Sequence, residues 1–392
     1  MRIIHVIANL SAATGGPPKA VLGMTQGLAR RGHDVTIYTT NFDGDADEDV
    51  PFDTPVDVGG VPVRYYPVQF PRFWKPSRPL GRALDRAVRD ADLVQIHSLY
   101  LYHDLAAANA CRRHGIPYVV MPHGSLDPFI WHRHRGRKRI VECWYMNRVL
   151  EQAAALHYTT EDERRLAAPF ARNDRHFIVG NGLDLDEFAN LPAAGSFRAL
   201  HPEIGDRPIV LFLGRLNFKK GLDILAPAFG EVLRAGHDAH LAIAGPDEDM
   251  ADRTRAWLRA AGALERTTFT GMIDGAERLA AFRDAAMFVL PSYSENFGIA
   301  VAEASACGLP VVISDAVNIW PDVEAADAGL VSGTDIAAVA ANISALLADP
   351  EKARRMGENG RKLVREKYSW DRIAEELEAA YREILENAAA TR

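Results

Sequence analysis

Short apolar runs alternate with longer stretches of helical periodicity along this chain, and this alternation limits how it can fold. Many of the runs are almost continuously apolar, which is typical of strands buried on both faces. Strand followed by helix, repeated, predicts parallel sheets joined by right-handed crossovers. The runs are 2–8, 34–40, 61–67, 92–97, 117–122, 155–160 and 176–180, then 208–214, 239–245, 266–271, 286–291, 309–314 and 328–332.

The strand and helix pattern restarts after a stretch containing proline and glycine, residues 181–208. A chain of 392 residues is long enough for two domains. We therefore predict an α/β protein of two doubly wound, Rossmann-like domains, 1–185 and 186–369, that face each other across a cleft. In such sheets ligands bind beyond the carboxyl ends of the strands. An amphipathic helix beginning near Trp370 follows, and its apolar face could pack on either domain.

Composition excludes several classes of function. The net charge of −7 provides no global basic field for nucleic acid. The three cysteines (Cys111, Cys143 and Cys307) are far apart and lack CxxC spacing, which indicates a reduced compartment and no zinc site. The apolar start of the chain is too short for a signal peptide, and no apolar run approaches 18 residues. We expect a cytoplasmic protein.

Two loops that follow predicted strands have the composition of anion sites. Gly15 and Gly16, followed by two prolines, open a helix that runs to about Arg31. Glycines let the backbone approach a ligand closely, and a helix N-terminus favours negative charge. The second loop, GRLNFKKG, carries Arg215 directly after a strand and Lys220 just before a helix. A guanidinium fork and an ammonium group together suit a diphosphate, although a solvated basic loop would look the same.

A third loop places two carboxylates eight residues apart. Glu295 lies before a helix that starts at Gly298, and Glu303 lies inside that helix. The backbone N–H groups of Phe297, Gly298 and Ile299 point into the same space. Glu303 has apolar neighbours, so it is predicted to be buried and to need partners. Because carboxylates accept hydrogen bonds from vicinal hydroxyls, the pair could bind both ends of a nucleotide sugar.

These residues resemble a known family. Residues 295–303 look like the Glu-x7-Glu signature of retaining glycosyltransferases of family 4, which have the GT-B fold. Gly15-Gly16 resembles the N-terminal glycine loop of the family, and GRLNFKKG resembles its Arg-x4-Lys-Gly motif. MPHGSLDP (121–128) resembles its His-Gly loop. GNGLD (180–184) is similar to its Pro-Asn-Gly-hydrophobic-Asp motif, with Gly180 in place of proline. The matches extend, in order, over most of the chain.

The resemblance implies roles for individual residues. His123 and Glu295 would be catalytic, with His123 bound to the transferred sugar near the reacting carbon. The tail helix 370–392 would cross back to the N-terminal domain, as in the GT-B fold. On the donor side the implied residues are Arg215 and Lys220 for the diphosphate, Glu303 for the ribose, Glu295, Asn296, Phe297 and Gly298 for the sugar, Met272 and Ile273 for the base, and Gly16. On the acceptor side we expect His97, Asp127, Arg133 and Arg135.

The implied reaction is transfer of a sugar from a nucleoside diphosphate sugar to a hydroxyl acceptor. The acceptor hydroxyl would attack the face that the nucleotide leaves, and a phosphate oxygen would take its proton. Stabilisation of charge on the diphosphate would replace a metal ion, and no cofactor is required. The acceptor would be a saccharide or a lipid-linked saccharide of bacterial surface polysaccharide synthesis. The donor could be a UDP, GDP or ADP sugar.

Other classes stay open. Asp-x-Asp pairs, the mark of metal-dependent transferases, occur in 43–49, 183–188 and 246–250, and only the last follows a strand. A dinucleotide oxidoreductase would fit the fold, but neither GxGxxG nor GxxxxGK[ST] occurs. A sugar-nucleotide epimerase of similar fold would bind the same ligand and need no acceptor. A two-domain sugar-binding protein would normally carry an export signal.

The segment 131–148 is a local basic patch in an acidic chain. Its cations lie near Trp131, Trp144 and Tyr145, and aromatic residues favour membrane interfaces. One interpretation is a solvated helix face whose aromatic rings pack into the core. The other is a peripheral membrane contact on anionic lipid beside a lipid-linked acceptor. The cations are Arg133, Arg135, Arg137, Lys138, Arg139 and Arg148.

Overall fold

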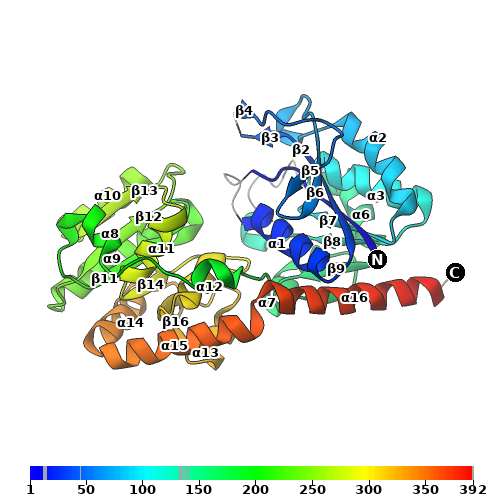
Figure 1. Ribbon diagram of the computed structural model, residues 1–392. Helices are drawn as coiled ribbons and strands as arrows, with labels where there is room; N and C mark the ends of the chain where they lie inside the picture. The colour runs from blue at the N-terminus through cyan, green and yellow to red at the C-terminus, as the bar shows by residue number, and fades with distance from the viewer. Residues whose placement is uncertain (12–15, 45, 132–135, 137–138, 140, 391–392) are drawn as a thin grey trace. The chain divides into compact units, whose positions relative to one another are not determined.

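The computed structural model describes residues 1–392 except 12–15, 45, 132–135, 137–138, 140 and 391–392 (Figure 1). The chain forms two compact units. The first is Met1–Gly182 together with Trp370–Arg392, and the second is Leu183–Ser369. The sequence-based boundaries were residues 185 and 369. The C-terminal helix therefore belongs to the first unit, as the resemblance implied.

The first unit is built on a sheet with strand order β10-β9-β8-β7-β1-β2-β6-β5. All neighbours are parallel except β5, which pairs antiparallel with β6. Each run predicted for this half contains a strand. The strands are β1 (Arg2–Val6), β2 (Asp34–Thr40), β5 (Val56–Val58), β6 (Val61–Tyr66), β7 (Leu93–His97), β8 (Tyr118–Met121), β9 (Ala155–Tyr158) and β10 (His176–Ile178), with a separate hairpin of β3 (Phe42–Asp43) and β4 (Ala46–Asp47).

Helices cover both faces of this sheet. They are α1 (Gly16–Arg30), α2 (Arg78–Ala87), α3 (Tyr102–His114), α4 (Pro128–Trp131), α6 (Asn147–Glu151), α7 (Glu161–Ala167) and α16 (Trp370–Ala390), with short 3-10 turns at Arg72–Trp74 and Val88–Asp90 and a π-helical turn at Glu142–Met146. Side chains of a strand alternate between faces. Ile3 and Leu93 accordingly pack with α1 and α16, whereas Ile4 and Val94 pack with α2, α3 and α6.

The second unit is built on a fully parallel sheet of order β13-β12-β11-β14-β15-β16. Its strands, all within predicted runs, are β11 (Ile209–Leu213), β12 (His240–Ala244), β13 (Thr267–Gly271), β14 (Met287–Leu290), β15 (Val311–Ser314) and β16 (Gly329–Ser332). Its helices are α8 (Ser196–Leu200), α9 (Leu222–Arg234), α10 (Ala251–Ala260), α11 (Gly275–Asp284), α12 (Ile299–Ala306), α13 (Trp320–Ala325), α14 (Ile336–Ala348) and α15 (Pro350–Lys367), with 3-10 turns at Leu185–Phe188, Pro202–Ile204, Phe218–Lys220 and Leu264–Arg266.

Strand order reverses once in each sheet. In the first unit β1 lies between β2 and β7, and in the second β11 lies between β12 and β14. Such a switch point leaves room between the loops that follow the two central strands, so ligands bind there. The switch points therefore select the loops after β1 and β7 in one unit and after β11 and β14 in the other.

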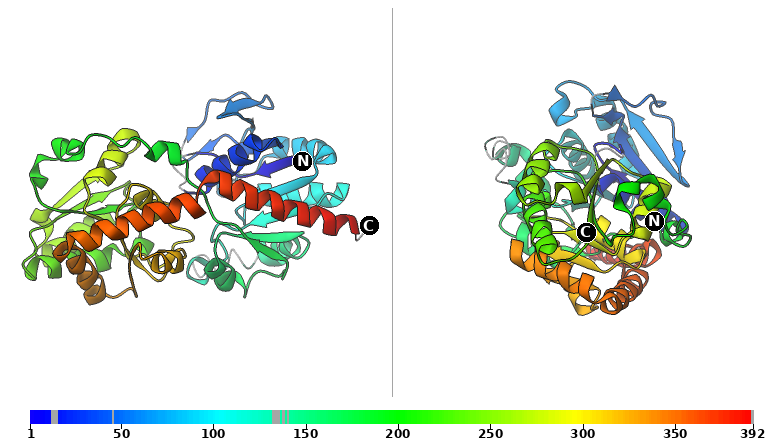
Figure 2. Two further views of the ribbon diagram at one scale, coloured as in Figure 1. Left: turned by 60° about the horizontal axis from the view of Figure 1, so that its bottom comes forward. Right: turned by 90° about the vertical axis from the view of Figure 1, so that its left-hand side faces the viewer.

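Helix α16 lies beside α1 within the first unit (Figure 2), and glycines allow the close approach. The ring of Trp370, at the start of α16, lies where a Cβ of Gly23 in α1 would overlap it. A Cβ on Gly182 would lie 2.6 Å from the same ring, and one on Gly27 would lie 2.9 Å from the Cβ of Ala374. Helices α1 and α16 approach this closely only because Gly23 and Gly27 have no side chain.

We expect Gly23→Ala to lower the stability of the first unit, although alanine is the better helix former by about 0.5–1 kcal/mol. Overpacking against Trp370 should cost about 1–3 kcal/mol and outweigh that gain. The measurement is urea unfolding of the variant and the wild type. Gly333→Ala is the control, because a Cβ at Gly333 meets nothing within 4 Å. Unchanged or higher stability of Gly23→Ala would contradict the close packing.

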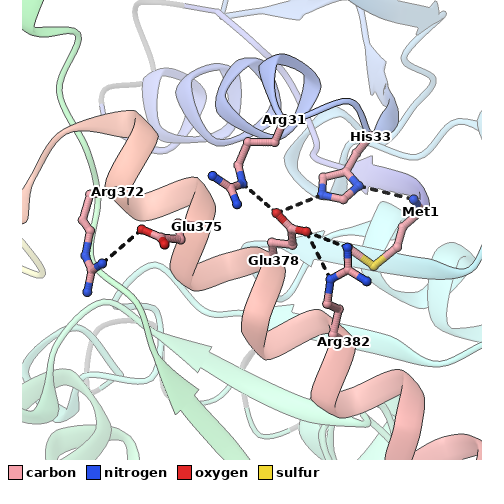
Figure 3. A network of polar contacts seen from close by, with 7 residues as sticks. All are labelled: Met1, Arg31, His33, Arg372, Glu375, Glu378 and Arg382. Carbon is pink, nitrogen blue, oxygen red and sulfur yellow. Dashed lines mark hydrogen bonds and ion pairs between the residues drawn. The ribbon is translucent and has the colours of Figure 1, made fainter.

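An ion cluster also fastens α16 (Figure 3). Glu378 accepts from Arg31 Nε at 2.6 Å and from Arg382 at 2.7 Å, and His33 Nε2 lies 3.5 Å away. The amino group of Met1 contacts His33 Nδ1 at 3.3 Å, which joins the N-terminus of the chain to the same network as α16. Hydrogen bonds from Arg382 and Arg31 lower the pKa of Glu378 to about 2, so this carboxylate stays charged.

Candidate functional site

The loops after β11 and β14 meet at the switch point of the second unit. Gly221, which ends the GRLNFKKG loop, has φ +68°, and a Cβ there would overlap the carbonyl oxygen of Pro291. The backbone N–H of Tyr293 donates to the carbonyl of Lys219 at 2.7 Å. The two loops are therefore in direct backbone contact, and their side chains share one surface.

Lys220 and Glu295 form an ion pair across this junction. The Lys220 side chain is 12% exposed and that of Glu295 is 17% exposed, so solvent screens the pair only partly. Burial alone would raise the pKa of Glu295, but the charges of Lys220, Lys219 and Arg215 outweigh it and lower the pKa. An ionised carboxylate beside an ammonium group suits a ligand that carries both hydroxyls and phosphate.

The backbone of Glu295 is held from the far side. Its N–H donates to Ala316 at 2.9 Å, and its carbonyl accepts from Asn318 at 3.1 Å. Gly298, which precedes α12, has φ +83°, and a Cβ there would lie 2.9 Å from Val317. Only glycine combines that dihedral with that space. The loop therefore reaches α12 in one conformation.

Asn296 and Phe297 complete this loop. The Phe297 ring is buried and packs edge-on against Tyr368 at 5.1 Å between centroids. Its side chain therefore anchors the loop in the core, which leaves backbone groups to face a ligand. The first N–H groups of α12 have no carbonyl partner within the helix.

Arg215 lies at the start of the GRLNFKKG loop and bonds Glu248 Oε1 at 2.6 Å. Asn217 Nδ2 bonds the other oxygen of Glu248 at 3.0 Å. A guanidinium has five N–H donors, so Arg215 can hold Glu248 and still bind an anion. Glu248 thus positions Arg215.

Glu303 is buried in α12, as predicted, and its partner is Arg278 of α11. Arg278 is itself buried and pairs also with Glu187 in the turn Leu185–Phe188. Burial would lower the pKa of Arg278, but the two carboxylates outweigh it and raise the pKa. One buried cation therefore serves two carboxylates, and this fixes the Glu303 side chain.

Residues predicted to contact the base lie at the end of β13. Gly271 has φ +72° and ends the strand, so the chain turns there. Met272 is 63% exposed, whereas Ile273 is buried in the core of the unit. Met272 is therefore available to a ligand, and Ile273 supports the turn from inside.

In the first unit, His123 follows β8 in a tight loop. Its φ of +52° is rare for a residue with a side chain, and Gly124 after it also has a positive φ of +75°. The loop is held by the buried Glu163, which accepts from Gly124 N at 2.8 Å and from Thr159 N at 2.7 Å. Strain of this kind persists only where the surroundings enforce it, and it gathers at functional sites.

Family models match both units. Residues 14–187 match glycosyltransferase family 4, and residues 196–363 match glycosyl transferases group 1. Alpha-maltose-1-phosphate synthase of Mycolicibacterium smegmatis is 30% identical over 311 residues, which cover 74% of this chain and 79% of that protein. The chain belongs to the group 1 and family 4 glycosyltransferases. An uncharacterized glycosyltransferase of Methanocaldococcus jannaschii is 26% identical over 93% of each chain.

Solved structures of glycosyltransferases share the fold. Sucrose-phosphate synthase from Thermosynechococcus elongatus has a TM-score of 0.77 at 24% identity, with 99% of this chain and 100% of that chain covered. HepE of Anabaena, in complex with UDP and glucose, has a TM-score of 0.76 at 16% identity, with 98% and 100% covered. The α/β fold of two parallel-sheet units predicted from the sequence is thus the GT-B fold.

The structure places only some of the predicted acceptor-side residues where they could contact an acceptor. His97 is fully buried, and its ring lies between His5 and His123, so it cannot touch an acceptor directly, contrary to our expectation. Asp127 accepts from the N–H of Phe129 at 2.8 Å, which places it at the start of α4. Arg133 and Arg135 lie outside the described residues. Gly16, on the donor side, is the first residue of α1.

The Asp-x-Asp alternative after β12 has a structural explanation. Asp247 Oδ1 accepts from the N–H groups of Met250 and Ala251, both at 2.9 Å, and so satisfies donors at the start of α10. Glu248, between the two aspartates, holds Arg215. Across the part of the chain that is described, no group of three or more His, Cys, Asp or Glu side chains is arranged to hold a metal ion.

Sequence reasoning missed three residues that position the site. Arg278, Glu163 and Glu248 each form a charged contact with a residue or loop that was predicted. Arg278 belongs to a helix of mixed composition, and nothing in its spacing pairs it with Glu303. A buried glutamate in an apolar helix was nevertheless a usable signal, because it required a cation from another element.

Proposed function

We propose that this glycosyltransferase transfers a sugar from a nucleoside diphosphate sugar to a hydroxyl acceptor, with retention of anomeric configuration and without a metal ion. The observation that carries the proposal is the joint placement of Lys220, Glu295 and Glu303. The first two meet at the switch point of the second unit, and the third lies eight residues after Glu295 in the helix that begins there.

The roles follow from charge and position. Lys220 and Arg215 stabilise the diphosphate, because both are cations on the loop after β11. Glu303 accepts hydrogen bonds from the ribose hydroxyls, and Glu295 with the backbone of Asn296 to Gly298 holds the sugar. Met272 lies beside the base. His123 hydrogen-bonds the transferred sugar, the role that the resemblance gives it.

In the proposed reaction the bond between the sugar and the diphosphate breaks as the acceptor oxygen approaches the same face. The proton of the acceptor hydroxyl passes to the departing phosphate oxygen. Lys220 and Arg215 stabilise the charge that grows on the diphosphate, a contribution worth most where water is excluded. Neither Glu295 nor Glu303 acts as a nucleophile, since they bind opposite ends of one ligand.

Relatives and neighbours suggest which donors to test. One relative, 35% identical over 216 residues that cover 53% of this chain and 56% of that protein, is a GDP-mannose-dependent mannosyltransferase of M. smegmatis. HepE was solved with UDP. Both bases are therefore reasonable probes. We propose a saccharide or lipid-linked saccharide as the acceptor, in keeping with the resemblance.

Membrane contact through 131–148 stays a prediction, because several of its cations lie outside the described residues. Within the segment, Trp144 is largely exposed, and it packs on Trp74 at 5.5 Å between ring centroids. Tyr145 is buried, as in the interpretation of a helix face packed on the core. None of the helices in the described part of the chain has the length and apolar character needed to cross a membrane.

Product analysis tests the proposal. UDP, GDP and ADP sugars are incubated with alkyl glycosides or a lipid-linked saccharide, with and without EDTA, and the products are examined by NMR. We expect a glycoside with the anomeric configuration of the donor, release of the nucleoside diphosphate, and no effect of EDTA. An inverted product, or loss of activity restored by manganese, would contradict the mechanism. A new sugar nucleotide formed without any acceptor would favour the epimerase.

A further inference from the structure

A row of polar side chains crosses the buried sheet of the first unit and ends at His123. His5 on β1, Gln95 and His97 on β7, and His157 on β9 are all fully buried. By strand register they lie on the face that α1 and α16 cover. Polar groups in such a position need hydrogen-bond partners, and the partners fix which ring nitrogens carry protons.

One half of the row has a single possible hydrogen-bond direction. His157 Nε2 lies 2.8 Å from the carbonyl of Val179, which can only accept, so Nε2 carries the proton. His157 Nδ1 therefore accepts from Gln95 Nε2 at 3.0 Å. The remaining oxygen of Gln95 accepts from the hydroxyl of Tyr381 in α16. Every member is satisfied with His157 neutral.

A neighbouring histidine, His103, has one buried ring nitrogen without a hydrogen-bond partner in the described part of the chain. His103 Nε2 lies 2.6 Å from the carbonyl of His97, so it must donate. His103 Nδ1 then carries a lone pair, and it has no hydrogen-bond partner among the described residues. The unmatched atom is an acceptor. Buried N–H groups without a partner are rarer than unmatched acceptors.

The other half of the row could run in two directions. His5 Nδ1 lies 2.9 Å from His97 Nε2, and His97 Nδ1 lies 3.0 Å from His123 Nε2. Each contact needs one donor and one acceptor. If His123 donates inward, His97 donates to His5, and His5 must carry its proton on Nε2. If His5 donates outward, His97 donates to His123, and His123 must carry its proton on Nδ1.

The far end of the row decides between them. His5 Nε2 is buried and has no hydrogen-bond partner among the described residues. If His123 donates inward, the N–H of His5 Nε2 is buried without a hydrogen-bond partner. If His5 donates outward, only the lone pair of His5 Nε2 lacks a partner, as at His103 Nδ1. We infer that His5 and His97 are positioning residues that hold His123 as the neutral tautomer with its proton on Nδ1.

This inference rests on the proposed function in one respect: it gives His123 a definite chemistry toward the substrate. With the proton on Nδ1, the half-buried His123 presents an N–H donor to a sugar oxygen, and it cannot accept a proton there as a base. An isolated imidazole prefers the opposite tautomer, so the buried pair imposes the less common form. Burial also lowers the pKa of His123 to about 3, which keeps the ring neutral.

The test is NMR of the full chain with ¹⁵N-labelled histidine, in which two-bond proton–nitrogen correlations identify the tautomer of each ring. His123 is assigned by the loss of its signals in His123→Asn. We expect a protonated Nδ1 and an unprotonated Nε2 at pH 7.5. A wild-type spectrum with the proton on Nε2 of His123 would overturn the inference.

Two variants at position 97 test who imposes the tautomer. The side-chain amide of Asn and the carboxylate of Asp both reach the place of His97 Nδ1, but Asn can donate and Asp accepts only. His97→Asn should keep His123 protonated on Nδ1, and His97→Asp should move the proton to Nε2. If the tautomer is the same in both folded variants, His97 does not set it. If His97→Asp does not fold, the wild-type and His97→Asn spectra still show which ring nitrogen of His123 carries the proton.

Failure of the proposed function would be seen separately. The tautomer is measured without substrate. If the spectra are as expected but no sugar is transferred, His5 and His97 still set the tautomer of His123, and only the proposed function is wrong. If sugar transfer is established, His97→Asp should lower the turnover, whereas His97→Asn should keep it close to that of the wild type. Equal turnover in the two variants would contradict the donor role of His123.

Discussion

Acidification from pH 6.5 to about pH 5 is expected to remove roughly 5 kcal/mol from the free energy of unfolding of the first unit. The reason is its buried, neutral histidines. Burial lowers the pKa of His5 to about 3 and those of His103 and His157 to about 4, against 6.5 in the unfolded chain, and burial lowers that of His97 as well. A loss of this size is comparable to the whole stability of many domains.

The sign follows from proton binding. Below pH 6.5 the unfolded chain protonates these rings and the folded chain does not, so acid favours unfolding. The stability is complete above pH 6.5 and is lost as the pH falls toward the folded pKa values. Each histidine contributes about 1.4 kcal/mol per pH unit in that window. Burial raises the pKa of Asp104 to about 7, which acts in the opposite direction and cancels about one histidine.

Urea unfolding followed by tryptophan fluorescence, at several pH values from 7.5 to 5, measures this dependence. In His103→Gln the amide can keep the hydrogen bond to the carbonyl of His97, so the slope should fall by about 1.4 kcal/mol per pH unit. His176→Gln is the control, because the ring of His176 is exposed. A stability that is flat from pH 7.5 to pH 5 would mean that these rings are not buried and neutral.

Strands were the most predictable part of this fold. Each apolar run became a strand of a parallel sheet, because burial on both faces leaves a signature in the residues themselves. β5 and the β3–β4 hairpin were missed, since they are two or three residues long and largely exposed or half-buried. Their pairing depends on neighbouring chain segments more than on their own composition.

The sequence predicted which loops carry the candidate site, but it did not predict the contacts between their side chains. The loops carrying Lys220 and Glu295 were predicted at carboxyl ends of strands, and the strand order brings them together. Their ion pair could not be inferred, because it depends on how two loops fold against each other. His97 shows the reverse case. It follows the right strand, but burial beside His5 gives it a supporting place, and a buried histidine in a strand normally looks like an ordinary core residue.

Loss of Lys220 should have the largest effect on donor binding. Lys220→Met removes the ammonium group from the loop after β11 and leaves the mostly buried Glu295 without its closest counter-charge. A diphosphate would then face an unpaired carboxylate. We expect a loss on the order of 3 kcal/mol, equal to about a hundredfold or more in affinity. Lys219→Met is the matched control, since it removes the same charge from the same loop and leaves the ion pair in place.

Calorimetric titration of the wild type, Lys220→Met and Lys219→Met with UDP, GDP and ADP sugars tests the donor site most directly. We expect that one class of nucleotide sugar binds the wild type, that Lys220→Met weakens this binding about a hundredfold or more, and that Lys219→Met changes it by no more than about fivefold. The proposed donor site would be contradicted if none of these donors bound the wild type, or if Lys220→Met bound the donor as tightly as the wild type does.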